Sequence, residues 1–301
     1  MKETLTLFGV LLLLGAGWGI TMPLTKITVA AGYQHFGLIF WQFVISALIM
    51  GLALAARKKL KIPNKVQWCF AAMIALIGTL LPNSASYQAA VHLPSGVISI
   101  LLSLIPMLAF PIALAFGTDR FSARKLIGLC LGFAAVALIA LHGDSFAGDV
   151  SIWWVAIALI APAFYALEGN IVAKWGTHGL DAMQTLFWAS MIGILPSFGL
   201  ALWSGQYIAI PRVWAAPEYA FVLSSIAHAL VYSGYVWLVG RAGSVFAAQV
   251  SYLVTIFGIF WAVTLLNESY AAGIWSALAL TLCGLFLVQP RRQSVANEAI
   301  I

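Results

Sequence analysis

Long runs of apolar residues alternate with short polar or glycine-containing breaks along nearly the whole chain. An α-helix of about 20 apolar residues spans the hydrocarbon core of a bilayer. The pattern therefore predicts an all-α membrane protein with ten transmembrane helices. The first run continues to Thr28 without a small-residue cleavage site, so we expect a retained helix rather than a signal peptide. The expected helices cover residues 5–31, 36–55, 67–88, 94–117, 124–142, 152–174, 181–203, 218–240, 245–266 and 270–289.

Composition agrees with a lipid environment. Of the 301 residues, 63% are hydrophobic and 8% are charged, whereas soluble domains carry roughly 25% charged residues. Cys69, Cys130 and Cys283 are scattered and have no disulfide or metal-ligand spacing, so we expect no metal and no cofactor. The chain also lacks a phosphate-binding loop and the H-E-x-x-H and G-x-S-x-G motifs. We therefore expect neither an ATP-driven pump nor an enzyme of the usual membrane classes.

The positions of the basic residues predict the orientation in the membrane. With the N-terminus placed in the cytoplasm, thirteen Lys and Arg residues fall inside, and only Lys26 and Arg212 fall toward the outside. This asymmetry follows the positive-inside rule and predicts that both termini are cytoplasmic. The dense basic run at residues 57–65 is then a cytoplasmic loop, not a nucleic-acid surface. We expect the protein in a bacterial inner (plasma) membrane, crossing it many times.

The chain repeats itself at an offset of about 148 residues. Each half, residues 1–145 and 150–290, contains five expected spans, and residues 291–301 form an expected cytoplasmic tail. Because five is odd, the second half is predicted to be inverted relative to the first. Inverted repeats with a binding site at their interface are a transporter architecture. The matching positions are Lys26 with Lys174, Gly32…Trp41 with Gly179…Trp188, Tyr87–Val97 with Tyr235–Val245, and Asp119 with Glu268.

These motifs resemble the EamA-type members of the drug/metabolite transporter superfamily over nearly the whole chain. The resemblance rests on Trp18-Gly19 with Pro23 and Lys26, on Tyr87 with Pro94-Ser95-Gly96-Val97, on Pro106, on Asp119-Arg120-Phe121-Ser122…Gly128, and on Glu268. The chain departs from the family pattern at Asp119, where Glu is usual, and at Val254, which lies opposite Pro106.

The resemblance implies a ten-helix bundle whose central cavity lies between the halves. Spans one to four and six to nine would line it, and spans five and ten would lie at the periphery. It also implies secondary transport by alternating access, commonly export of amino acids, amines or related metabolites. The expected partners are a small-molecule substrate, the lipid bilayer and a coupling proton, with the protein a monomer or homodimer. Fold-level analogy does not name the substrate.

Glu168 is the acidic residue placed deepest within an expected span. A charge near the middle of a transmembrane helix costs at least ~2.5 kcal/mol and usually faces the bundle interior. We interpret Glu168 as a binding group for a substrate ammonium or a coupling proton. The alternative is a structural hydrogen bond to a neighbouring polar residue, such as Asn170.

The eighth span carries a polar and aromatic stripe. Ser224, His228, Tyr232 and Tyr235 are spaced so that they share one helical face. His228 and Tyr232 are predicted to line the cavity, and His228 can relay a proton because imidazole titrates near neutral pH. The alternative for His228 is a hydrogen bond between helices with no role in transport.

Several other spans offer amide and aromatic side chains. Ring faces attract cations, so these residues suit an organic amine, although Trp and Tyr near span ends also serve as interface anchors. The predicted binding residues besides Glu168, His228 and Tyr232 are Trp18, Gln42, Asn83, Tyr87, Trp188, Gln249 and Tyr252.

Prolines inside the expected spans mark places where helices bend, because proline leaves a backbone carbonyl without its partner. They are Pro23, Pro82, Pro106, Pro111, Pro162 and Pro196. Pro162, close to Glu168, is interpreted either as a hinge or as an ordinary packing kink.

Taken together, these features predict a secondary-active transporter of a small amphipathic metabolite, acting as an exporter. Two alternatives stay open. One is import of a larger metabolite such as a vitamin or nucleotide-like compound. The other is an intramembrane enzyme or sensor that uses Glu168 and His228.

Overall fold

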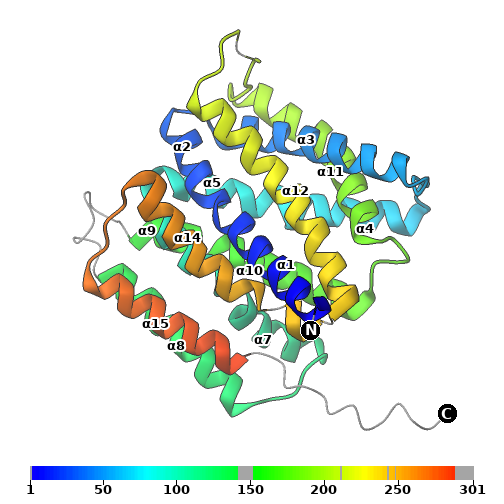
Figure 1. Cartoon of the computed structure of the whole chain (residues 1–301). Coiled ribbons are helices and arrows are strands. Elements are labelled where there is room, and N and C mark those ends of the chain that lie inside the picture. The colour runs from blue at the N-terminus through cyan, green and yellow to red at the C-terminus, as the bar shows by residue number, and fades with distance from the viewer. Residues whose placement is uncertain (1, 142–151, 211, 243, 248, 289–301) are drawn as a thin grey trace, which may run out of the picture.

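The computed structural model describes residues 2–141, 152–210, 212–242, 244–247 and 249–288, and within these ranges every regular element is a helix (Figure 1). Seven helical segments are long and apolar enough to cross a membrane, and α12, α14 and α15 complete ten spans. The all-helical fold predicted from the sequence is confirmed. The tail beyond residue 290 and His142 lie outside the described residues.

The first half contributes five spans. They are α1 (Lys2–Gly19) with α2 (Thr21–Ala30); α3 (His35–Ala56); α4 (Lys65–Ala75) with the π-helical η1 (Leu76–Leu80) and α5 (Leu81–His92); α6 (Ser95–Leu102) with α7 (Ile105–Phe116); and α8 (Ala123–Leu141).

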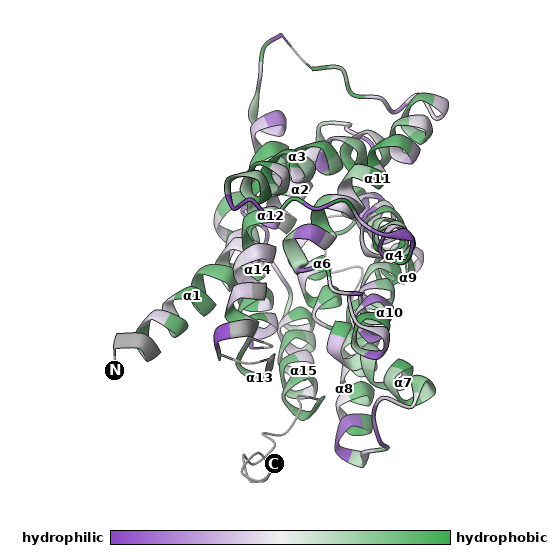
Figure 2. Ribbon diagram, turned by 90° about the vertical axis from the view of Figure 1, so that its right-hand side faces the viewer, coloured by the Kyte–Doolittle hydropathy of each residue, from purple (hydrophilic) through white to green (hydrophobic). Residues whose placement is uncertain are grey.

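The second half has the same order of spans. They are α9 (Ile152–Ala158) with α10 (Ile160–Trp175); α11 (Ala182–Trp203); α12 (Ala216–Ala242); α13 (Ser244–Ala247) with α14 (Val250–Leu266); and α15 (Ala272–Val288). Apolar residues run along these helices, and hydrophilic residues gather at helix ends and connections (Figure 2).

Three spans are interrupted a few residues before a proline. The breaks fall at Ile20, at residues 103–104 and at Leu159, and the prolines that follow are Pro23, Pro106 and Pro162. Proline has no N–H to bond the carbonyl four residues earlier, so the helix yields within that turn. Pro82 likewise lies close to a break, as the second residue of α5, which follows η1. Four of the six prolines therefore lie at divisions of their spans, whereas Pro111 and Pro196 lie inside the uninterrupted helices α7 and α11.

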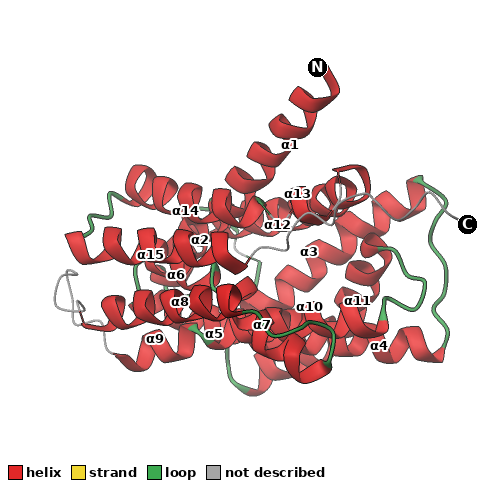
Figure 3. Cartoon of the chain, turned by 90° about the horizontal axis from the view of Figure 1, so that it is seen from below, coloured by secondary structure: helices red, strands yellow, loops and turns green. Residues whose placement is uncertain are grey.

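Antiparallel helix pairs join the two halves. Helices α3 and α11 lie side by side, and α8 and α15 form a second pair on the opposite side of the bundle (Figure 1). A Cβ on Gly128 would come within 2.7 Å of the Gly284 carbonyl oxygen, and one on Gly284 would meet Gly128 equally closely. Glycine at both positions permits this approach. Seen from below, the start of α1 projects from the bundle (Figure 3).

The contacts of α3 with the second half are matched by equivalent contacts of α11 with the first half. Trp41 Nε1 of α3 donates to the Ile208 carbonyl after α11, at 2.8 Å. Its counterpart, Trp188 Nε1 of α11, donates to the Lys61 carbonyl after α3, at 3.1 Å. The turns before both helices contain matching glycines, Gly32 and Gly179, with φ of 94° and 85°. Each half thus uses its tryptophan to hold a connection of the other half.

Candidate functional site

A chain of amides and phenols crosses the interior of the bundle. Gln42 on α3 and Asn83 on α5 are buried, with 7% and 8% of their surfaces exposed. The Gln42 Oε1 atom accepts from Asn83 Nδ2 and from the Tyr87 hydroxyl, both at 2.8 Å. Tyr165 on α10 donates to Asn83 Oδ1 at 2.7 Å. These four residues, called the amide–phenol network below, link spans two, three and six.

Glu168 lies one turn beyond Tyr165 on α10, at the π-helical segment η1. A Cβ built on Gly78 would stand 2.9 Å from the carboxyl carbon and from both carboxyl oxygens of Glu168. Glycine at position 78 therefore leaves the room that this carboxyl group occupies. Glu168 makes no hydrogen bond or ion pair to any residue that the structure describes, so the structural alternative involving Asn170 has no contact to support it. Asn170 instead donates to the Ala109 and Ala166 carbonyls.

Phenols from two helices lie near the Glu168 carboxyl group. Tyr165 of α10 and Tyr232 of α12 both lie within electrostatic range of it. Short π-helical insertions such as η1 occur often at functional sites. The carboxyl group, the phenols and the amide–phenol network form the candidate functional site.

The stripe on α12 divides between two neighbours. Tyr232 lies within electrostatic range of Glu168, whereas Ser224 donates to the Thr21 carbonyl at 3.5 Å. The ring of Trp18 lies 6.4 Å from His228 and 5.5 Å from Tyr235, measured between centroids. His228 and Trp18 therefore belong to an aromatic cluster between α1 and α12, next to the candidate site.

Three residues predicted as binding groups lie elsewhere. Trp188 packs against Trp68 and Phe187 beside the 57–64 connection, where its N–H donates to the Lys61 carbonyl. Gln249 is exposed and precedes α14. Tyr252 packs against the core cluster that includes α8 and α15, and its buried hydroxyl has no hydrogen-bond partner in the described part of the chain.

Sequence reasoning did not select Tyr165, Gly78 or η1 as part of the site. Tyr165 carried a usable signal, because it lies three residues before Glu168 and so shares its helical face. No signal in the sequence pointed to Gly78, because its role depends on how closely α10 approaches the third span.

One end of the bundle, where α3, α6 and α12 begin, is called the outer end after the orientation predicted from the charges. Here Lys26 donates to the carbonyls of Ala90, Val91 and Leu93 at 2.8, 3.1 and 3.0 Å. Glu268 accepts from Ser95 N and Oγ at 2.9 Å and from Gly96 N at 3.3 Å. Lys26 and Glu268, called the outer clasp, hold the α5–α6 turn from both sides.

A phenol completes the outer clasp. Tyr270 donates to the same Glu268 carboxylate. Burial raises the pKa of Tyr270, and the hydrogen bond to Glu268 raises it further, so the phenol stays protonated as a donor.

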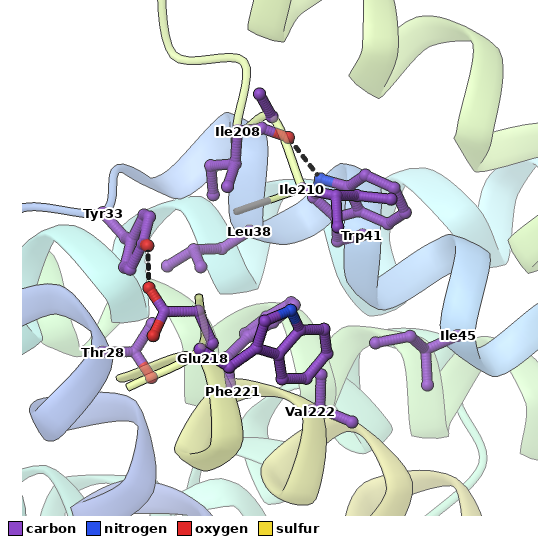
Figure 4. Close-up of a pocket in the computed structure, with 12 residues that line it drawn as sticks. Thr28, Tyr33, Leu38, Trp41, Ile45, Ile208, Ile210, Glu218, Phe221 and Val222 are labelled. Carbon is purple, nitrogen blue, oxygen red and sulfur yellow. Dashed lines mark hydrogen bonds between the residues drawn. The ribbon is translucent and has the colours of Figure 1, made fainter. Parts of the chain in front are cut away.

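The outer end also holds a cavity of about 260 Å³ between α2, α3, α12 and the connection after α11 (Figure 4). Tyr33 and Glu218 face each other at one end of it, joined by a hydrogen bond from the phenol. That bond to the carboxylate raises the pKa of Tyr33, which keeps the hydroxyl protonated. Trp41 and Ile45 lie at the other end.

The fold and its interior define a class of protein. Ten spans in two inverted halves, with a carboxyl group, phenols and amides between them, are the architecture of a multi-pass membrane transporter. The model of the EamA-like transporter family matches residues 7–141 and 152–289. The chain belongs to this family, and the family resemblance seen in the sequence is confirmed.

Similar proteins agree with this assignment. The uncharacterized transporter YvbV of Bacillus subtilis is 25% identical over 94% of this chain and 91% of its own. The uncharacterized transporter sll0355 of Synechocystis is 22% identical over 92% and 87%. A probable terminal-alkyne amino-acid exporter of Streptantibioticus cattleyicolor is 26% identical, over 41% of this chain and 42% of its own. A crystal structure with 18% identity matches 95% of this chain and 96% of its own at a TM-score of 0.60, which shows the fold.

Proposed function

We propose that the protein is a secondary-active exporter of a small amine or amino acid, working by alternating access between its two halves. The observation that carries this proposal is Glu168, a carboxyl group deep in a span with no charged or hydrogen-bonding partner in the described residues. The substrate named for one partial relative, an amino acid, also supports it.

The surroundings of Glu168 suit an ammonium group. A carboxylate without a partner in a lipid-embedded bundle is costly, and a bound ammonium or proton removes that cost. The rings of Tyr165 and Tyr232 lie within electrostatic range of the carboxyl group, and aromatic rings attract cations. The amide–phenol network offers polar groups for the remainder of a substrate. Substrate and proton then compete for one carboxyl group, which couples export to proton entry.

We also propose the orientation in the membrane, the coupling ion and the fate of the substrate. Both termini lie in the cytoplasm of a bacterial cell, so the outer clasp faces outward, as the charge asymmetry favours. The coupling ion is a proton. No enzymatic step takes part, and the substrate leaves chemically unchanged.

The test is uptake and counterflow of labelled amino acids and amines in proteoliposomes at pH 5.5–8, about the range in which a coupling proton would act. We expect pH-dependent counterflow in the wild type and its loss in Glu168→Gln. Asp181→Asn is the matched control: Asp181 caps α11 through Gln184 N, and asparagine caps a helix equally well. Unchanged transport in Glu168→Gln would refute the role of Glu168. Chemical conversion of a lipid-soluble compound without counterflow would favour a membrane enzyme.

A second pair of variants tests the position of the carboxyl group without changing its charge. The Cβ of Gly78→Ala would enter the space of Glu168, whereas Gly169→Ala adds a Cβ with no atom within 4 Å. We expect Gly78→Ala to reduce the transport rate at least about tenfold, because small displacements of a binding group are costly. Gly169→Ala should transport like the wild type. Equal rates in both variants would show that this approach has no part in transport.

A further inference from the structure

The connection between α3 and α4 carries a dense positive charge that the chain itself does not neutralise. Residues 57–65, called the basic loop below, contain no acidic residue and five exposed cations: Arg57, Lys58, Lys59, Lys61 and Lys65. None of these cations forms an ion pair with a carboxylate in the described part of the chain. The charge of the basic loop is therefore available to a partner outside the chain.

The second half of the protein holds the backbone of the basic loop in place. The Lys59 carbonyl accepts from Gln184 Nε2 at 2.9 Å, and the Lys61 carbonyl accepts from Trp188 Nε1 at 3.1 Å. At the end of the loop, the Asn64 side chain caps α4. Because the bonds to Lys59 and Lys61 use backbone carbonyls, they fix the path of the chain and leave the ammonium groups exposed.

Apolar side chains alternate with the lysines. Leu60 and Ile62 are 49% and 86% exposed, although apolar surface in water is costly. Close by, the rings of Trp68 and Trp188 pack with centroids 5.0 Å apart, and Trp68 stays 37% exposed. Tryptophan at the ends of membrane spans favours the headgroup level of the bilayer. At that level the apolar side chains of the loop can reach acyl chains, and its cations can reach phosphate groups.

The inverted repeat offers a comparison at the other end of the bundle. The connection after α11 is held in the same way, by Trp41 Nε1 at the Ile208 carbonyl. It also exposes apolar side chains, Val213 and Trp214 among them, but Arg212 is the one basic residue between positions 204 and 215 of the sequence. Exposed apolar groups are thus common to both connections, whereas the cluster of cations belongs to the basic loop.

We propose that the basic loop is a binding site for anionic phospholipid headgroups. The ammonium groups of Lys59 and Lys61 contact the phosphate groups, and Leu60 and Ile62 enter the acyl-chain region. Clusters of four to eight Lys and Arg residues next to a membrane span attract anionic lipid, and the basic loop supplies five. This site is independent of the proposed function, because it requires only that the protein lies in a bilayer.

The test measures binding of phosphatidylglycerol and of phosphatidylcholine to the full-length protein in detergent, by native mass spectrometry. We expect the wild type to prefer phosphatidylglycerol at least about 25-fold. Lys59→Gln combined with Lys61→Gln should weaken phosphatidylglycerol binding by about that factor, roughly fivefold for each charge lost. Binding of phosphatidylcholine should not change, because both substitutions keep the backbone carbonyls that anchor the loop.

A matched control separates the loop from overall charge. Arg120→Gln combined with Arg212→Gln also removes two exposed cations, from two other connections, and should bind phosphatidylglycerol like the wild type. A second variant, Ile62→Ser, tests the apolar contact at a highly exposed position. We expect it to weaken binding of both lipids about fivefold. The unfolding temperature of each variant reports whether it folds.

Three results would overturn the proposal. One is equal affinity of the wild type for the two lipids. Another is equal weakening by the two double variants, which would mean that overall charge attracts the lipid. The third is displacement of phosphatidylglycerol by a short single-stranded oligonucleotide, which would assign the basic loop to nucleic acid. Transport is not measured in this test, so failure of the proposed function would leave the lipid site standing.

Discussion

The outer clasp and its counterpart at the inner end use matching residues in different ways. At the outer end, Lys26 and Glu268 both bind the α5–α6 turn. By the internal repeat, their counterparts are Lys174 and Asp119, and the matching turn includes residue 243, which lies outside the described residues. Among the described residues, Lys174 donates to the Phe116 carbonyl at 2.8 Å, and Asp119 accepts from Arg120 N and pairs with Lys125. The partners of both counterparts in the described part of the chain thus lie between Phe116 and Lys125.

The same pair of residue types, a lysine and an acidic residue, thus makes different contacts at the two ends of the bundle. A cation at the C-terminus of α5 and an anion at the N-terminus of α6 each complement the helix dipole, so the outer clasp is a favourable arrangement. The same arrangement is available in principle to the repeat at the inner end. Under alternating access, we expect the two clasps to form in turn, and in the structure the outer clasp is formed.

The largest effect should come from breaking the outer clasp. Lys26→Met removes an ammonium that serves three backbone carbonyls, and we expect it to destabilise the fold by about 2 kcal/mol. Lys174→Met, which removes a bond to one carbonyl at an exposed position, should cost less than about 1 kcal/mol. Thermal unfolding in detergent measures both.

The same pair of variants reports on opening. In a background with Cys69, Cys130 and Cys283 replaced by serine, Ser86→Cys places a thiol on α5 at a buried position. We expect a membrane-impermeant maleimide added from outside to label it faster in Lys26→Met than in Lys174→Met. Equal labelling and equal unfolding temperatures would contradict the asymmetry between the two ends.

A smaller and symmetrical effect is expected where the halves are alike. Trp41→Phe and Trp188→Phe each remove one tryptophan-to-carbonyl hydrogen bond and keep most of the aromatic ring. Each should therefore cost about 1 kcal/mol of stability, again read from unfolding temperatures. Strongly unequal losses would mean that the α3–α11 contacts are not equivalent and that the asymmetry extends beyond the clasps.

The smallest effect concerns the pairing of Asp119 at the inner end. Burial alone would raise the pKa of Asp119, but the hydrogen bond and charge of Lys125 lower it overall. The pair therefore adds stability above the unfolded-state pKa near 3.8 and loses it as the pH falls through the lower folded-state value. At neutral pH, Asp119→Asn should cost less than about 1 kcal/mol. Compared with the wild type, its unfolding temperature should vary less below pH 4; an identical decline would contradict this.

The sequence was sufficient for the spans because their apolar runs are long and their ends are polar. The second span was expected at 36–55 and forms His35–Ala56; the tenth was expected at 270–289 and forms Ala272–Val288. The divisions within spans were only partly predictable. Pro162 marked a break at Leu159, whereas Pro196 lies inside an uninterrupted α11, since neighbouring helices decide whether the lost bond opens the turn.

The site was less predictable than the spans. Gln42, Asn83 and Tyr87 were selected as polar groups in separate spans, and the structure joins them by hydrogen bonds. Trp188 and Tyr252 were selected on the same grounds and lie elsewhere. In a membrane protein both the core face and the lipid face of a helix are apolar, so the pattern does not reveal how the helix is rotated. That rotation depends on packing between distant segments.

The reciprocal tryptophan contacts between α3 and α11 have a consequence for how the gene product can be divided. A five-helix half made alone would lack the carbonyl that its tryptophan binds and the tryptophan that holds its own connection. A cut between Leu141 and Ile152 would leave both contacts intact if the fragments meet in one membrane. We expect the two fragments to accumulate only when co-expressed, each acting as the folding partner of the other.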